Sequence, residues 1–143
     1  MTAHRFQELT RAEALDLLGS VGVGRIVFTH QALPAIRPVS HLLDDGQVIV
    51  RGNAGAGLSS VLDTVVAYEA DLISPSGGIS WSVVVTGMAR RLRGGAALAR
   101  YEELLRPWTA GQSGEDYVVR IHPELVTGYS IVDENSARGA ASG

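Results

Sequence analysis

The chain of 143 residues contains no cysteine and no lysine, since all 12 of its basic residues are arginine. Without cysteine it can form no disulfide, no thiolate metal site and no cysteine nucleophile. Without lysine it can form no Schiff base and has no phosphate-loop lysine. An anionic ligand must therefore be held by arginine side chains, backbone N–H groups or hydroxyl groups.

Long apolar runs and a strong net charge are also missing. No run approaches the ~20 residues of a membrane-spanning helix, and residues 1–9 are polar, without the apolar centre of a signal peptide. The net charge of −3 provides no general attraction for nucleic acid. We therefore expect a cytoplasmic protein with neither a membrane nor a nucleic acid as its partner.

The usual catalytic and metal-binding motifs do not occur. The four histidines, at positions 4, 30, 41 and 122, lack helical metal-ligand spacing, so we predict no metal site. The G-x-S-x-G motif of a serine hydrolase is absent. Asp44 and Asp45 fall in a predicted hairpin turn, where acidic residues are common. No residue can be identified from the sequence as a catalytic acid, base or nucleophile.

What the sequence does contain is a series of short strands. Alternating or β-branched apolar residues predict strands at residues 21–29, 35–43, 47–51, 64–73, 79–92, 117–122 and 126–132. The segment from Thr10 to Glu13 is a capping box that opens a helix ending near Gly19. A second helix is predicted at residues 96–105, and one or two helical turns within residues 54–62.

This order of elements predicts a mainly β fold. The strands follow one another without regular crossover helices, which favours an antiparallel β-barrel with short helices covering its ends. Gly87 is expected to bend the long segment 79–92, as closing a barrel requires. We expect a single domain over residues 1–132 and a flexible tail over residues 133–143.

One predicted hairpin has the features of a binding site. Arg37 and Pro38 open its first strand, and Arg51, Gly52 and Asn53 close its second. A glycine-rich segment follows at once, with Ser59 and Ser60 able to donate hydroxyl hydrogen bonds. A cation and small residues at the edge of a sheet suit an anionic ligand with a flat body.

The order of these motifs resembles the pyridoxamine 5′-phosphate oxidase-like flavoproteins, which have the FMN-binding split-barrel fold. The resemblance is strongest to the small bacterial branch that includes nitroimidazole-resistance-type proteins. The matching segments are residues 21–26, 37–39, 48–51, 57–58, 79–87, 106–108 and 119–123. Each segment is short, and their order and spacing over roughly residues 9–132 carry the resemblance.

The resemblance implies a homodimer with FMN at the subunit interface and an oxidoreductase activity on an unidentified small molecule. The flavin ring would lie beside the first strand of the hairpin, and the phosphate beside the end of the second strand and the helical turn. The implied cofactor-binding residues are Arg37, Pro38, Val39, Ser40, Arg51, Gly52, Asn53, Gly57, Leu58, Ser59, Trp81, Ser82, Val83 and Trp108.

The sequence departs from the family pattern at Gly57, where many relatives carry lysine. Losing one charge-assisted contact costs about 1.5–3 kcal/mol, which weakens FMN binding by about one to two decades. Two alternatives therefore stay open. The fold could hold a deazaflavin coenzyme or haem, with His41 or His122 as the haem ligand, or it could form a non-catalytic flavin-binding dimer.

Overall fold

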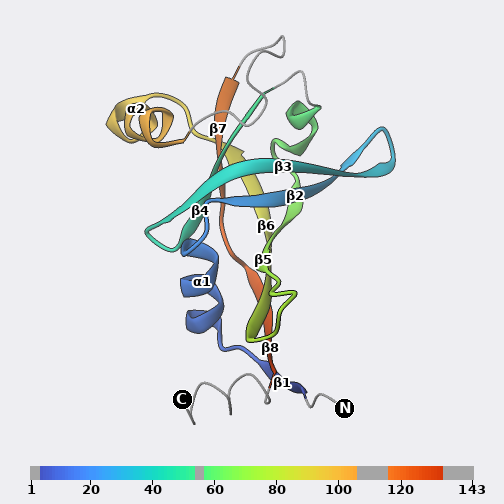
Figure 1. Ribbon diagram of the computed structural model, residues 1–143. Helices are drawn as coiled ribbons and strands as arrows, with labels where there is room; N and C mark the ends of the chain where they lie inside the picture. Colours follow the sequence, from blue (N-terminus) through green and yellow to red (C-terminus); the bar gives the residue numbers. More distant parts are fainter. Residues whose placement is uncertain (1–3, 54–56, 106–115, 134–143) are drawn as a thin grey trace.

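The structure is a computed structural model that describes residues 4–53, 57–105 and 116–133 (Figure 1). Within these ranges the chain forms eight strands, two α-helices and a 3₁₀ helix. In chain order they are β1 (His4–Glu8), α1 (Arg11–Gly19), β2 (Val23–His30), β3 (Leu33–Asp44), β4 (Gln47–Asn53), the 3₁₀ helix η2 (Leu58–Val61), β5 (Val65–Leu72), β6 (Ile79–Arg91), α2 (Gly95–Leu104), β7 (Asp116–Ile121) and β8 (Leu125–Asp133).

Six of the strands close into an antiparallel barrel. The sheet order is β1-β8-β6-β5-β2-β3-β4-β7, and an additional pairing of β6 with β7 joins the two sides. Strands β8 and β1 lie outside this ring and extend the sheet from β6. The predicted mainly β antiparallel barrel is confirmed.

The barrel is split because β6 changes its partner along one edge. Residues 79–86 of β6 pair with β8, whereas residues 89–91 pair with β7. Gly87 stands at the change, and a Cβ atom there would lie 1.8 Å from the carbonyl oxygen of His122. Only glycine lets the link between β7 and β8 approach so closely. The segment 79–92 is thus one long strand, and Gly87 marks the point where the barrel opens.

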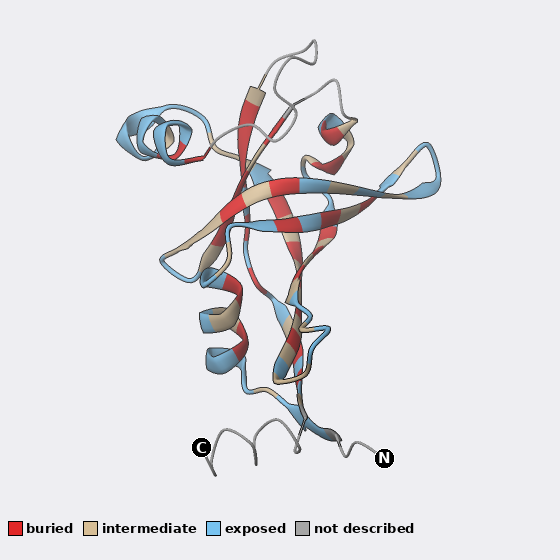
Figure 2. Cartoon of the chain, viewed as in Figure 1, coloured by how far each residue is buried: buried red, intermediate tan, exposed pale blue. Residues whose placement is uncertain are grey.

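The core fills the barrel, and small helices cover its two ends (Figure 2). At one end α1 buries Ala14 and Leu18, and its N-terminus has the predicted capping box, with Thr10 and Glu13 bonding each other's backbone N–H. At the other end, η2 buries Leu58 and Val61. The two helices thereby shield the core side chains from solvent at both ends of the barrel.

Helix α2 differs from the expectation, because it covers the outside of the barrel and not an end. A second cluster of buried residues, Ile49, Tyr101, Leu105 and Val118, joins α2 to the outer faces of β4 and β7. Ile49 and Val118 alternate with inward-facing neighbours such as Val48 and Val119, which belong to the main core. Strands β4 and β7 therefore bury side chains on both of their faces.

At the two ends of the described chain, the structure adds one strand and extends another. No strand was predicted within residues 1–9, yet residues 4–8 form β1, which pairs with β8. The first residue of the predicted tail, Asp133, is the last residue of β8; the rest of that tail lies outside the described residues. An isolated polar edge strand such as HRFQE lacks the apolar alternation that reveals a strand.

Candidate functional site

The two strands of the predicted binding hairpin meet η2 at one edge of the barrel. Ser40 of β3 is paired directly with Arg51 of β4. The next residue, Gly52, is buried, and a Cβ atom there would lie 2.5 Å from Cδ1 of Leu58 in η2. Glycine at position 52 therefore lets η2 pack against β4. The structure brings the predicted ring-side and phosphate-side segments together.

Polar side chains surround the start of η2. Gly57 caps the helix in the left-handed conformation with φ +81°, a region that strongly favours glycine. This conformation is a physical reason for glycine where many relatives carry lysine. The ring of His30 lies beside it, and its Nδ1 is 2.7 Å from the hydroxyl oxygen of Ser60. The side chain of Ser59 is exposed.

Arg51 is bound mainly to α2. Its Nη1 donates hydrogen bonds to the carbonyl oxygens of Glu102 (2.7 Å) and Leu105 (2.8 Å), and its Nη2 lies 3.3 Å from Asp116 Oδ2. Those carbonyls are at the C-terminal end of α2, where a cation is favoured by the helix dipole. Only Nε, which is buried, has no hydrogen-bond partner within the described part of the chain.

A cavity of about 240 Å³ lies beside Arg51 and also borders Tyr117, Arg91 and Leu98. The hydroxyl of Tyr117 is buried without a partner among the described residues. Burial raises the pKa of Tyr117 to about 12, so this hydroxyl keeps its proton at neutral pH. Two unsatisfied donors therefore border one cavity, and an acceptor atom from a ligand or from water would suit both.

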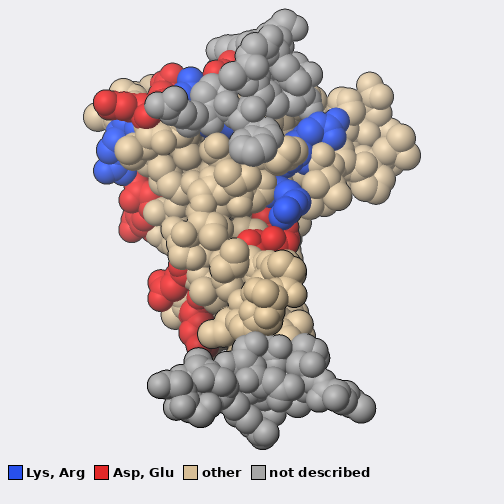
Figure 3. Space-filling view, viewed as in Figure 1, with Lys and Arg blue, Asp and Glu red and all other residues tan. Residues whose placement is uncertain are grey.

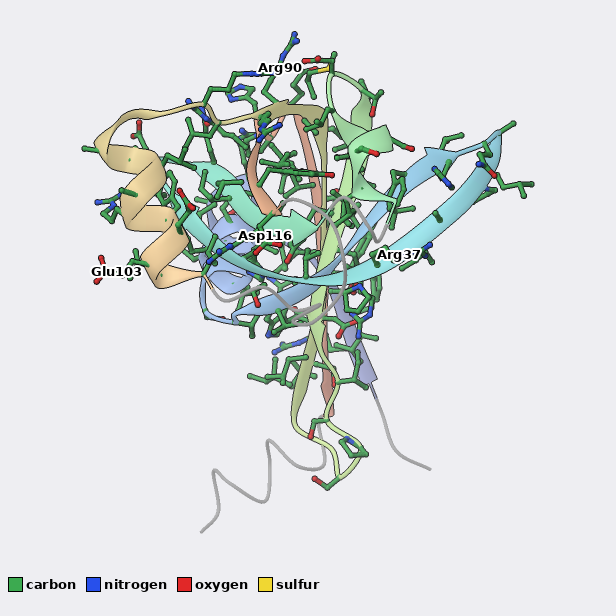
Figure 4. The ribbon with its side chains drawn as sticks, turned by 90° about the horizontal axis from the view of Figure 1, so that it is seen from above. Arg37, Arg90, Glu103 and Asp116 are labelled. Atoms are coloured by element: carbon green, nitrogen blue, oxygen red, sulfur yellow. The ribbon has the colours of Figure 1, made fainter. Side chains whose placement is uncertain are left out.

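The outward faces of β3, β2 and β5 carry both uncharged and charged residues. Pro38 is exposed and paired with Arg25, whose Nη1 lies 2.7 Å from Glu69 and 3.5 Å from Asp71. Arg37 donates to the carbonyl oxygen of Ile36 (2.8 Å). Figure 4 shows Arg37 on β3 on the opposite side of Asp116 from Glu103, which is on α2.

Four predicted site residues have their side chains in the core, because Leu58 of η2, which is 3% exposed, joins Val39, Trp81 and Val83 there. Val39, Trp81 and Val83 are 2%, 5% and 0% exposed. Ser82 faces the other side of β6, where it is paired with Asp71 and Tyr129. Val39, Trp81 and Val83 can offer a ligand little beyond their backbone groups. For Asn53 the backbone ends β4, and Trp108 lies outside the described residues.

A buried polar chain that the sequence did not predict ties α1 to the barrel. His41 Nε2 lies 2.8 Å from the carbonyl oxygen of Leu18, which can only accept, so Nε2 carries the proton. Nδ1 then accepts a hydrogen bond from the hydroxyl of Tyr68. Burial lowers the pKa of His41 and raises the pKa of Tyr68. With both nitrogens engaged, His41 is poorly suited to bind haem iron.

Among the described residues, no group of three or more histidine, aspartate or glutamate side chains is arranged to hold a metal ion. Among the same residues, no helix has the length and apolar character needed to cross a membrane.

In the view of Figure 3, all visible basic side chains lie in the upper half, around the barrel. Among the described residues, the lower part of that view shows only acidic and uncharged side chains. On this face, positive charge is therefore concentrated at the end of the molecule that carries η2, α2 and the β3–β4 edge.

The chain is similar to known proteins over almost its whole length. A family model described as pyridoxamine 5′-phosphate oxidase matches residues 10–130. An uncharacterized protein of Mycobacterium tuberculosis (strain ATCC 25618 / H37Rv) is 47% identical over 140 residues, which cover 94% of this chain and 91% of that protein.

Solved structures share the fold. A Corynebacterium glutamicum protein, described provisionally as a pyridoxamine 5′-phosphate oxidase, is 32% identical with a TM-score of 0.73, over 88% of this chain and 98% of that one. The FAD-binding protein from Mycobacterium smegmatis is 29% identical, with a TM-score of 0.68. The match covers 88% of this chain and 98% of that one. A protein from Bacteroides thetaiotaomicron, described provisionally as a 5-nitroimidazole antibiotic resistance protein, shares the fold alone. It is 10% identical, with a TM-score of 0.68, and the match covers 92% of this chain and 91% of that one.

Proposed function

This chain belongs to the pyridoxamine 5′-phosphate oxidase family, and from that membership we propose that it binds a flavin nucleotide and acts as an oxidoreductase on a small molecule. The family is the one that the order of sequence motifs predicted. When bound, a flavin supplies hydride or electron transfer at its ring, while the protein positions and tunes it. The FAD-binding relative from Mycobacterium smegmatis supports a flavin as the cofactor.

The observation that carries this proposal is the meeting of β3, β4 and η2 at one edge of the barrel. Ser40 is paired with Arg51, and Gly52 contacts Leu58, so a ring along β3 and a phosphate at η2 would be neighbours. The residues present fit a phosphate without lysine, since Ser59 is exposed and His30 and Ser60 lie beside Gly57. Arg51 would then act indirectly, by holding α2 beside the site.

The identity of the cofactor is tested by releasing the ligand from purified protein and measuring its mass. We expect FMN, and FAD is the alternative that the Mycobacterium smegmatis relative favours. Titration of the ligand-free protein with FMN, FAD, a deazaflavin and haem then ranks their affinities. Failure to bind any flavin would contradict the proposal, and a haem absorption band without flavin would select the haem alternative.

The position of the phosphate is tested by replacing Ser59 with aspartate. Ser59 is exposed, so the substitution should preserve the fold while its carboxylate repels a phosphate at η2. We expect FMN affinity to fall by about ten-fold or more, which corresponds to about 1.4 kcal/mol. Riboflavin has no phosphate, so its affinity should be unchanged in the same variant.

The matched control for this experiment is Ser76→Asp. Ser76 is also exposed but lies in the loop between β5 and β6, so FMN affinity should stay at its original value. If Ser59→Asp bound FMN as tightly as the unmodified chain, the phosphate would have to lie elsewhere.

We also propose that the protein is a homodimer. Support comes from the outer face of the sheet, where the strand register aligns Val27 with Ile36 and with Ala67, and Thr86 with Ala67 and Leu125. Ile36 and Leu125 are 56% and 59% exposed. Large exposed apolar side chains of this kind suit a protein–protein contact, although the same face also carries the Arg25–Glu69 ion pair. The family resemblance implies flavin sites at the interface.

A further inference from the structure

A groove of about 530 Å³ lies where β6 pairs with β7, away from the proposed flavin site. Its lining residues are Gln47, Met88, Arg90, Arg120, His122 and Glu124. Gln47 begins β4, at the opposite end of that strand from Arg51, and none of the six is among the residues that we assign to the flavin. In Figure 4, Arg90 lies at the margin of the molecule, well separated from Arg37 and Asp116.

Two arginines lie side by side in this groove. Arg90 of β6 is directly paired with Arg120 of β7 in the antiparallel register. Directly opposed residues have Cβ atoms about 4.5–5.5 Å apart, and like charges in such a pair are destabilising. Both side chains are exposed, so neither contributes to the core. Packing and pairing therefore give no reason for two cations at this place.

The protein neutralises this pair only in part. Arg90 Nη1 lies 2.8 Å from Asp63 Oδ1, but both side chains are largely exposed, at 63% and 72%, and exposed ion pairs are weak. The Arg120 side chain has no ion pair or hydrogen bond with any residue that the structure describes. Of the groove's other lining residues, only Glu124 carries a negative charge.

The remaining lining residues suit an organic anion. Guanidinium groups hold phosphate oxygens through paired hydrogen bonds, and His122 and Gln47 add further polar groups at the same groove. Met88 is half-buried in its lining and offers an adaptable apolar contact. The volume of the groove falls within the range of small-molecule sites.

We propose that this groove binds a small organic phosphate, with the phosphate held by Arg90 and Arg120 and the organic part resting on Met88. The site is separate from the flavin and does not depend on it. It gives a role to the basic residues at the end of β6 that flavin binding leaves unexplained.

The test uses 4-nitrophenyl phosphate as the probe, with inorganic phosphate and 4-nitrophenol as comparisons, in titration calorimetry on the full chain as purified. We expect saturable binding of 4-nitrophenyl phosphate, weaker binding of inorganic phosphate and no binding of 4-nitrophenol. Arg120→Ala should weaken the binding by about ten-fold or more, as expected for a charge-assisted contact. Arg120→Gln should have a similar effect and keeps the length of the side chain.

The control variant is Arg93→Ala. Arg93 is also an exposed arginine close to the end of β6, but it does not line the groove, so its removal should leave the affinity unchanged. The flavin content of each variant should equal that of the original protein, which separates this site from the proposed function. The proposal would be overturned if Arg120→Ala and Arg120→Gln bound 4-nitrophenyl phosphate as tightly as the original chain. An equal loss of affinity in Arg93→Ala, or absence of saturable binding, would also overturn it.

Discussion

At the scale of single residues, His41 links stability to pH. The ring is buried, donates from Nε2 to Leu18 and accepts from Tyr68. Burial holds its pKa below the ordinary value of 6.5. In the unfolded chain this histidine therefore takes up a proton near pH 6.5, whereas in the folded chain it stays neutral until a lower pH. Between these two pH values the unfolded state binds more protons than the folded state.

We predict that the free energy of unfolding falls as the pH is lowered from about 7.5 through 6.5, by up to about 1.4 kcal/mol per pH unit from this one group. The loss stops once the pH is below the folded pKa. Urea unfolding at a series of pH values measures it. His41→Gln should lower stability at neutral pH and remove this part of the pH dependence, whereas His122→Gln, at an exposed position, should keep it. An unchanged slope in His41→Gln would contradict the prediction.

At the scale of elements, two side chains of the barrel fasten α2. Asp44 at the end of β3 accepts hydrogen bonds from Arg100 and Tyr101 of the helix. Arg51 on β4 bonds the carbonyl oxygens of Glu102 and Leu105, and a small cluster around Ile49 and Tyr101 lies beneath the helix. The helix begins at Gly94 without a side-chain hydrogen bond to its cap. Its C-terminal contact with Arg51 is therefore one of two polar contacts that hold it against the barrel.

We predict that Arg51→Met destabilises the protein by about 1.5–3 kcal/mol, since it removes hydrogen bonds from a charged donor but keeps an apolar stem. Amide hydrogen exchange should accelerate in α2 more than in β2 or β5. The control is Arg93→Met, which alters an exposed arginine in the link to the same helix. Unchanged exchange in α2 would show that the apolar cluster and the contacts of Asp44 hold the helix without Arg51.

Much of this arrangement could be predicted from local sequence patterns. The capping box at Thr10 and the alternation of Trp81, Val83 and Val85 against Ser82 depend on neighbouring residues, and both appear as predicted. The function of Arg51 could not be predicted, because it depends on where the end of α2 lies in space. Strand β1 was missed because its order comes from pairing with β8 and not from its own composition.

In the candidate site, too, the features set by local sequence could be predicted and those that depend on distant contacts could not. The sequence identified the hairpin and the glycine-rich segment, and the structure joins them through Gly52 and Leu58. The sequence could not distinguish inward from outward side chains at Val39, Trp81 and Val83, because a single pattern fixes alternation but not which face is buried. It also contained no signal for the contact between His30 and Ser60, which lie on separate elements.

At the scale of the whole molecule, the proposed dimer can be tested at the exposed apolar side chains of the sheet. We predict that the protein sediments as a dimer and that Leu125→Glu shifts it to a monomer, because a charge in an apolar contact is costly to bury. Flavin content should fall in parallel if the sites are at the interface. Leu104→Glu is the matched control, since Leu104 on α2 is 61% exposed and Leu125 is 59% exposed. A monomeric parent protein, or a dimer unaffected by Leu125→Glu, would contradict this prediction.

The pairing of β1 with β8 has a consequence for the order in which the molecule can be completed. β1 has no other strand partner among the described residues, yet β8 is the last of the described strands to be made during synthesis. While the barrel strands are emerging from the ribosome, β1 has nothing to pair with, and its backbone groups stay hydrated. The outermost edge of the sheet therefore forms after translation has passed Asp133. This join between the two ends of the fold is the longest-range contact in the sheet, and such contacts form slowly.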